Sequence, residues 1–71
     1  MKYMVVVEHG PSSIGAYVPD LPGCVAVGES EDEALSLIRE AIELHLEALH
    51  EQGLQVPEPS SSSAFVEVAA A

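Results

Sequence analysis

Over the first 28 positions, apolar residues alternate with polar ones or form short runs, which is the spacing of β-strands. Residues 3–7 are apolar on both faces, as in a strand that is covered on two sides. Residues 14–18 alternate apolar positions with Gly15 and Tyr17, and a Gly-Pro pair separates them from the first run. These patterns predict an antiparallel hairpin of strands 3–7 and 14–18, followed by a third strand at 24–27.

A proline-containing turn joins the second and third predicted strands. The residues Leu21, Pro22, Gly23 and Cys24 fit a type II β-turn, because Pro22 fixes φ at the second position and Gly23 accepts the positive φ of the third. Asp20 precedes the turn and is expected to accept a backbone N–H from within it. No group in the turn is arranged for chemistry, so we interpret it as a structural corner.

A long helix is predicted over residues 31–52. Ser30 is a favourable N-cap, and Glu33 completes a capping box three residues later. Gly53 lies where a left-handed residue ends a helix, and Leu54 is the apolar residue that usually follows. Such a helix would be about 33 Å long, whereas strands of ordinary length reach only about 17–20 Å.

The apolar face of this helix is wider than one contact with a sheet requires. We therefore expect part of it to pack on a second copy of the chain, and His45, Leu46 and Leu49 are the candidate interface residues. A lone histidine on an apolar face is usually a core or interface residue. The alternative for His45 is a pH switch, since small shifts move the histidine charge through neutrality.

A proline- and serine-rich stretch, residues 57–63, separates the helix from a last apolar segment. Residues 64–68 predict a fourth strand, and a right-handed crossover would place it parallel to the first strand and beside it. The chain is then a single domain over residues 1–71. The predicted fold class is α+β, in the order β-β-β-α-β, with one sheet and a long helix on one of its faces.

The charge of the chain is strongly acidic and limits its partners. Twelve acidic side chains against two basic ones give a formal net charge of −10. Direct binding to nucleic acid or to anionic membranes is not expected, because contacts with phosphate need Lys and Arg. A basic protein would be attracted, although an acid excess can also serve solubility alone.

One stripe of acidic side chains runs along the predicted helix at spacings of three, four and four: Glu40, Glu43, Glu47 and Glu51. Like charges at these spacings repel one another, and Arg39 is the neighbouring cation that softens the repulsion. We interpret the stripe as a candidate surface for a basic partner. The alternative is an ordinary solvated helix face.

The sequence contains no catalytic constellation, and we predict neither an enzyme nor a cofactor. The three histidines are not brought together by their spacing, so a zinc site is not expected. Cys24 is the single cysteine and is expected to be a small buried hydrophobe. Glu8 and Asp20 could approach across the hairpin, but two carboxylates are weak evidence for a metal. The absence of a signal peptide or a long apolar run favours a cytoplasmic protein without a membrane span.

Three blocks of residues, in this order and at these distances, resemble the HicB antitoxin family: Tyr17-x-Pro19-Asp20-Leu21-Pro22-Gly23-Cys24, Gly28-x-Ser30-x-x-Glu33-Ala34 and Gly53-x-x-Val56-Pro57-x-Pro59-Ser60. The resemblance implies a partial ribonuclease H-like fold. It also implies a partner, a HicA-type toxin, which is a small basic ribonuclease that cuts messenger RNA. A protein with this acid excess could compete for the surface that holds phosphates.

Many members of that family carry a C-terminal DNA-binding domain, whereas this sequence stops shortly after its last predicted strand. The expectation is a minimal HicB-like antitoxin, a homodimer or higher oligomer, that does not bind an operator itself. One alternative is an orphan oligomeric interaction module of the same fold without a toxin partner. A third hypothesis is a residual magnesium-dependent nuclease that uses Glu8 and Asp20.

Overall fold

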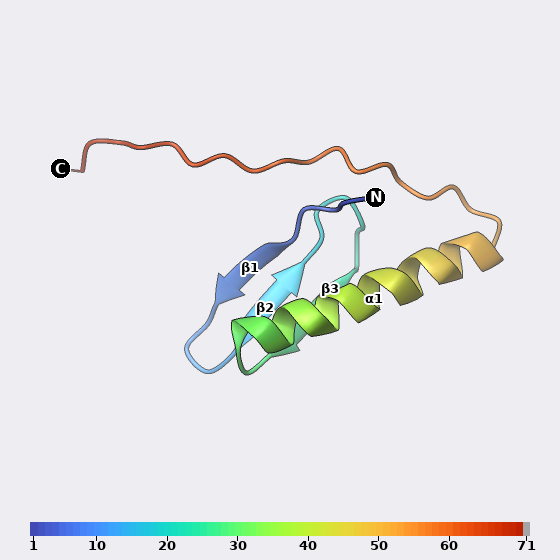
Figure 1. Ribbon diagram of the computed structural model, residues 1–71, viewed down its shortest axis with the longest axis horizontal. Coiled ribbons are helices and arrows are strands. Elements are labelled where there is room, and N and C mark those ends of the chain that lie inside the picture. Colours follow the sequence, from blue (N-terminus) through green and yellow to red (C-terminus); the bar gives the residue numbers. More distant parts are fainter. Residues whose placement is uncertain (71) are drawn as a thin grey trace.

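The computed structural model describes residues 1–70 and contains three β-strands followed by one α-helix (Figure 1). Their bounds are Val6–His9 for β1, Ile14–Tyr17 for β2, Val25–Gly28 for β3 and Glu31–Glu51 for α1. The strands form one antiparallel sheet in the order β1-β2-β3. This arrangement confirms the predicted α+β class.

The two faces of the sheet have different surroundings. Ala16 of β2 pairs with Ala26 of β3, and these residues belong to the face that packs against α1. The neighbouring pair, Tyr17 and Val25, points to the opposite face, because side chains alternate along a strand. Both of these residues are exposed. The helix therefore covers one face of the sheet and leaves the other open.

The core is small and lies between the sheet, the proline turn and the first half of α1. Leu21, at the start of the turn, and Ile38 of the helix are its largest fully buried side chains. The N–H of Cys24 donates to the carbonyl of Leu21 at 3.0 Å, and Gly23 has a φ of 85°. These are the hydrogen bond and the positive φ that the predicted turn requires. The turn thus contributes Leu21 to the core.

The close packing of α1 on β3 depends on Gly28. A Cβ atom at this position would lie 2.8 Å from the backbone nitrogen of Ala34, a distance that Cβ contacts do not reach. The absence of a side chain at Gly28 therefore lets the start of the helix lie directly on the end of β3.

Side chains cap the N-terminus of α1. The Ser30 Oγ accepts a hydrogen bond from the N–H of Glu33 at 3.1 Å, as predicted. The Glu33 carboxylate accepts one from the N–H of Glu29 at 2.9 Å, one residue earlier than in a standard capping box. The first bond satisfies one of the N–H groups that a helix start leaves without a partner, and the second ties Glu29, just before the cap, to the first turn.

The C-terminus of α1 ends in a Schellman motif. Gly53 has a φ of 69°, and its N–H donates to the carbonyl of His50. The N–H of Leu54 donates to the carbonyl of Leu49 at 2.9 Å. These two bonds define the motif, and they confirm the predicted type of helix end. The helix itself ends at Glu51, one residue earlier than predicted.

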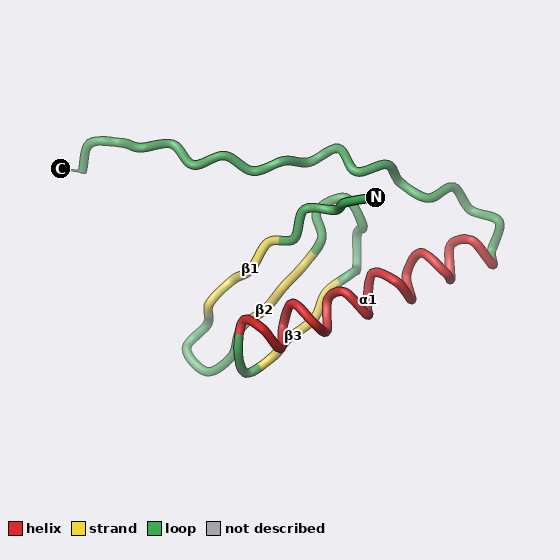
Figure 2. The backbone as a smooth tube through the Cα atoms, in the orientation of Figure 1, coloured by secondary structure: helices red, strands yellow, loops and turns green. Residues whose placement is uncertain are grey.

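The helix is much longer than the strands beneath it. Its 21 residues span about 32 Å, whereas four-residue strands span about 13 Å. Figure 2 shows the second half of α1 lying beyond the sheet. Leu44, in this half, is 67% exposed.

The predicted fourth strand is not observed: residues 64–68 form no strand, so the order β-β-β-α-β is wrong in its last element. After α1 the chain turns back past the N-terminus and continues as an extended stretch (Figure 1). We call residues 60–70 the C-terminal arm; all of them are exposed. A strand requires a backbone partner, and the arm passes the sheet on the side of β1 without pairing with any of its strands (Figure 1).

Candidate protein-interaction site

An apolar groove lies between the N-terminal residues and α1. Its volume is about 350 Å³, and its lining includes Tyr3, Val5, Ile38, Ile42 and Leu46. The helix supplies Ile38, Ile42 and Leu46 at successive spacings of four, which puts them in one row. We call this the apolar groove.

The other wall of the apolar groove is the chain that leads into β1. Tyr3 and Val5 are half-buried and pack against the core. The alternation of side chains places them on the same face as Val7, which pairs with the buried Ala16. The sequence contains this signal in the odd-numbered positions of the first apolar run. The signal alone does not predict a groove, because the other wall comes from distant residues of α1.

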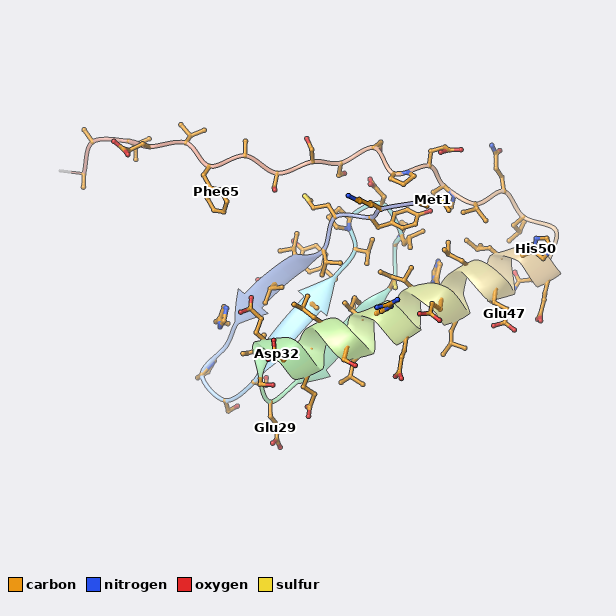
Figure 3. All side chains as sticks on the ribbon, viewed as in Figure 1. Met1, Glu29, Asp32, Glu47, His50 and Phe65 are labelled. Carbon is orange, nitrogen blue, oxygen red and sulfur yellow. The ribbon has the colours of Figure 1, made fainter. Side chains whose placement is uncertain are left out.

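The predicted acidic stripe lies on the exposed side of α1. Glu40, Glu43 and Glu47 line a shallow hollow of about 320 Å³ together with Leu44. Figure 3 shows Glu47 projecting from the helix away from the sheet. Glu51 is also exposed but belongs to the last turn of α1 and does not line the hollow. We call Glu40, Glu43, Leu44 and Glu47 the acidic hollow.

An ion pair links the apolar groove with the acidic hollow. The Arg39 Nε lies 3.6 Å from the Glu43 Oε1, and both side chains line the groove while remaining largely exposed. Exposed pairs of this kind contribute at most about 1 kcal/mol to stability. Arg39 offsets the charge of Glu43, and Glu40 and Glu47 keep the hollow acidic.

The three residues predicted for an oligomer interface are only partly available. His45, Leu46 and Leu49 are all half-buried, and Leu46 packs against the core of its own chain. Leu44 is the more exposed apolar residue of this part of the helix. Its position between glutamates one turn before and after it gave no sequence signal for an interface.

Asp20 holds the root of the C-terminal arm, a role that the sequence did not indicate. Its Oδ2 accepts the backbone N–H groups of Ser60 and Ser61, each at 2.9 Å. Its Oδ1 accepts the hydroxyls of Ser61 at 2.7 Å and Ser60 at 3.1 Å. Asp20 was expected to accept a backbone N–H from its own turn, and these four bonds from distant serines are observed instead. We call these four hydrogen bonds the Asp20 clamp.

The Asp20 clamp stabilises the ionised carboxylate. The backbone N–H of Ser61 contributes most, followed by the Ser61 hydroxyl and the N–H of Ser60, and together they lower the pKa of Asp20 from 3.8 to about 2. A second contact fixes the same segment, because the Tyr3 hydroxyl donates to the carbonyl of Pro57. Burial raises the pKa of Tyr3, and the charges of Glu58 and Asp20 raise it further.

The remaining candidates for chemistry lie apart. Among residues 1–70, no three His, Cys, Asp or Glu side chains are close enough to hold a metal ion. Both oxygens of Asp20 are engaged by serines, so the hypothesis of a magnesium pair with Glu8 gains no support. Cys24 is buried, and burial raises the pKa of its thiol. No helix in the described part of the chain is long and apolar enough to cross a membrane.

Comparison with known proteins supports the resemblance to HicB antitoxins in both fold and sequence. The solved N-terminal domain of the Burkholderia pseudomallei antitoxin HicB is 39% identical and superposes with a TM-score of 0.71, over 82% of this chain and 69% of that one. Antitoxin HicB 2 of Photorhabdus laumondii is 32% identical over 99% of this chain and 51% of its own length. A UPF0150 protein of Thermoplasma acidophilum is 35% identical over 93% of this chain and 97% of its own length.

The chain thus spans about half the length of the antitoxin relative from Photorhabdus, and nearly all of the shorter protein from Thermoplasma. The protein-family model described as "HicB_like antitoxin of bacterial toxin-antitoxin system" matches residues 3–69 of this chain. This match covers the sheet, the helix and most of the C-terminal arm. The protein belongs to the HicB-like antitoxin family.

Proposed function

We propose that this protein binds a small basic ribonuclease of the HicA type and blocks its access to RNA. The observation that carries the proposal is family membership combined with a net charge of −10. A ribonuclease holds its substrate through Lys and Arg contacts to phosphate. An acidic protein competes for that same surface, and its field speeds the encounter. The proposed action is binding and not catalysis, in the cytoplasm, where messenger RNA is cut.

The acidic hollow has the composition of a small docking site. The Leu44 side chain is 67% exposed and has Glu40 and Glu47 on either side of it along the helix. Interfaces commonly combine an apolar centre, which loses contact with water, with a charged rim that aligns the partners. Leu44 would supply the centre, and Glu40, Glu43 and Glu47 would face the basic side chains of the ribonuclease.

The experiment measures complex formation and RNA cleavage together. The purified chain is mixed with a HicA-type protein, taken from the neighbouring gene where one is present, and the dissociation constant is measured by calorimetry at 50 and 200 mM salt. We expect a stable complex that weakens as salt rises and that stops cleavage of an RNA substrate. No complex at micromolar concentrations, or no such protein encoded nearby, would favour the orphan interaction module instead.

A matched pair of variants tests the acidic hollow. Glu40→Gln/Glu43→Gln/Glu47→Gln removes three charges from it. The control, Glu8→Gln/Glu29→Gln/Glu58→Gln, removes three exposed charges elsewhere and so gives the same net charge. Binding should weaken at least tenfold in the first variant and much less in the second. Equal losses would show that total charge, and not this surface, attracts the ribonuclease.

We also infer that the protein self-associates. Its core is small, and a chain of this length buries only about 60% of the surface that the unfolded chain exposes. Large apolar side chains outside the acidic hollow also remain exposed along α1, namely Leu35 and Leu37. Contact with a second copy would cover part of this surface, and sedimentation measurements over a range of concentrations test it.

A further inference from the structure

We propose that residues 57–61 form a stiff strap that couples the C-terminal arm to the apolar groove, and that Tyr3 is the residue that connects the two. This coupling acts within one chain and does not depend on toxin binding. Three features of the structure support it: the two anchors of the strap, the stiffness of the chain between them and the position of Tyr3 in the wall of the groove.

The strap is anchored at both ends to parts of the chain that are distant in sequence. At its start, the carbonyl of Pro57 accepts a hydrogen bond from the Tyr3 hydroxyl. At its end, Ser60 and Ser61 donate the four hydrogen bonds of the Asp20 clamp. Figure 1 shows the chain passing the N-terminus after it leaves α1. The strap therefore connects the chain that leads into β1 with the proline turn.

The chain between the two anchors has little freedom to bend. The rings of Pro57 and Pro59 fix φ at both positions. Glu58 precedes Pro59, and steric contact with the proline ring restricts it to extended conformations. Short proline-rich segments of this kind act as semi-rigid spacers. A displacement at the Asp20 clamp is therefore passed on to Pro57 and is not absorbed between the anchors.

Tyr3 takes part in the strap and in the groove at the same time. Its side chain lines the groove across from Ile38 and Ile42 of α1, and it packs against the core. Its hydroxyl donates to the carbonyl of Pro57. Two torsions place a tyrosine ring, and the contact with Pro57 fixes the far end of this one. The strap thus sets the position of one wall of the groove.

The charges near Tyr3 favour the same hydrogen bond. Burial raises the pKa of Tyr3, and the negative charges of Glu58 and Asp20 raise it further. Both effects keep the phenol protonated. A protonated hydroxyl is the donor that the carbonyl of Pro57 requires, so the strap and the clamp help to preserve the contact that joins them to the groove.

These contacts form a continuous path from the arm to the groove. Asp20 does not itself line the groove, so it acts on the groove through other residues. Coupling between two positions is reciprocal. Loss of the Asp20 clamp should therefore move the wall of the groove, and loss of the Tyr3 hydroxyl should loosen the start of the arm. If the anchors were independent, neither effect would occur.

Methyl NMR measures the first effect, because the chain contains only three isoleucines. Ile38 and Ile42 line the groove, whereas Ile14 belongs to β2 and does not. Asp20→Asn should shift the δ1-methyl signals of Ile38 and Ile42 several times more than that of Ile14. Glu58→Gln is the matched control, since it removes a charge from the strap but no hydrogen bond, and it should leave all three signals nearly unchanged. Groove methyls that do not respond to Asp20→Asn would overturn the proposal.

Hydrogen exchange measures the reverse effect at the arm. Tyr3→Phe keeps the ring in the groove and removes only its hydroxyl. We expect the Ser60 and Ser61 amides to exchange about fivefold faster in this variant, as for the loss of one hydrogen bond. Tyr17→Phe is the control, because it removes the hydroxyl of an exposed tyrosine on the open face of the sheet. Equal exchange in the two variants would show that the contact with Pro57 does not hold the arm.

A flexible residue in the strap distinguishes this path from one through the core, since Asp20 also adjoins the buried Leu21. Pro59→Gly frees the backbone between the anchors and leaves both anchors in place. In the Pro59→Gly protein, Asp20→Asn should no longer move the Ile42 methyl signal. In a Pro11→Gly protein, which is altered in the β1–β2 turn instead, it should still do so. A response of Ile42 that persists in Pro59→Gly would place the coupling in the core and contradict the strap.

Discussion

The carboxylate of Asp20 accepts two hydrogen bonds from Ser61, a residue 41 positions later in the chain. One bond comes from the Ser61 backbone and the other from its hydroxyl, at 2.9 and 2.7 Å. Asp20 thus links the proline turn, which contributes Leu21 to the core, with the start of the C-terminal arm. The position of the arm depends on this contact between distant parts of the sequence.

Replacing Asp20 by asparagine should loosen the arm and leave the body intact. An asparagine side chain has a single acceptor oxygen, so it cannot receive the four hydrogen bonds of the Asp20 clamp. We expect faster hydrogen exchange at the Ser60 and Ser61 amides and unchanged protection in α1. Glu58→Gln is the matched control, because it removes a nearby charge without removing a clamp bond. Unchanged exchange at the serine amides would show that the arm is held by other contacts.

Lowering the pH should release the clamp without a substitution. The pKa of Asp20 is about 2 in the folded protein and 3.8 without the clamp. Because the folded pKa is the lower one, the stabilisation is fully present above about pH 4 and is lost as the pH falls toward 2. Amide shifts of Ser60 and Ser61 in an NMR titration should report a midpoint near 2. A midpoint near 3.8 would mean that the four bonds do not form in solution.

A methyl group at Gly28 should destabilise the protein because it would meet the backbone of Ala34. Overpacking of this kind costs about 1–3 kcal/mol. The control is Gly15→Ala, whose Cβ would meet nothing closer than 4.0 Å. Urea denaturation should place the midpoint of Gly28→Ala well below that of Gly15→Ala. Equal midpoints would mean that α1 shifts on β3 at little cost.

The local elements of the fold were predictable because their signals lie within a few residues. Ser30 and Glu33 mark the start of α1, and Gly53 marks its end, as the hydrogen bonds confirm. The turn at Gly23 was predictable for the same reason, since a positive φ is a property of one residue and its neighbours. These signals need no knowledge of the distant chain.

The interaction surfaces were predictable only in part, because they depend on where distant residues meet. The acidic character of Glu40, Glu43 and Glu47 follows from their spacing on a helix. The apolar groove needs Tyr3 and Ile38 to lie on either side of it, and the Asp20 clamp needs residues 40 and 41 positions apart. Residues 64–68 have strand composition, but composition alone does not determine whether a strand of the sheet pairs with them, and none does.

Two leucine-sized residues of α1 should separate stability from binding. Ile38 is buried in the core, and Leu44 is 67% exposed. Ile38→Ala should cost about 2–5 kcal/mol of unfolding free energy, because it removes buried methyl groups and leaves a cavity. Leu44→Ala should leave the unfolding free energy within about 0.5 kcal/mol of the wild type and weaken toxin binding, since Leu44 is the apolar centre of the acidic hollow.

Thermal or urea unfolding measures the first effect, and calorimetry with the ribonuclease measures the second. The two readouts are independent, because a folded Leu44→Ala protein that binds weakly has lost a contact and not its structure. Leu35→Ala is the control, since Leu35 is an exposed leucine of the same helix that lines the apolar groove and not the acidic hollow. If Leu35→Ala weakens binding and Leu44→Ala does not, the ribonuclease docks on the groove side of α1.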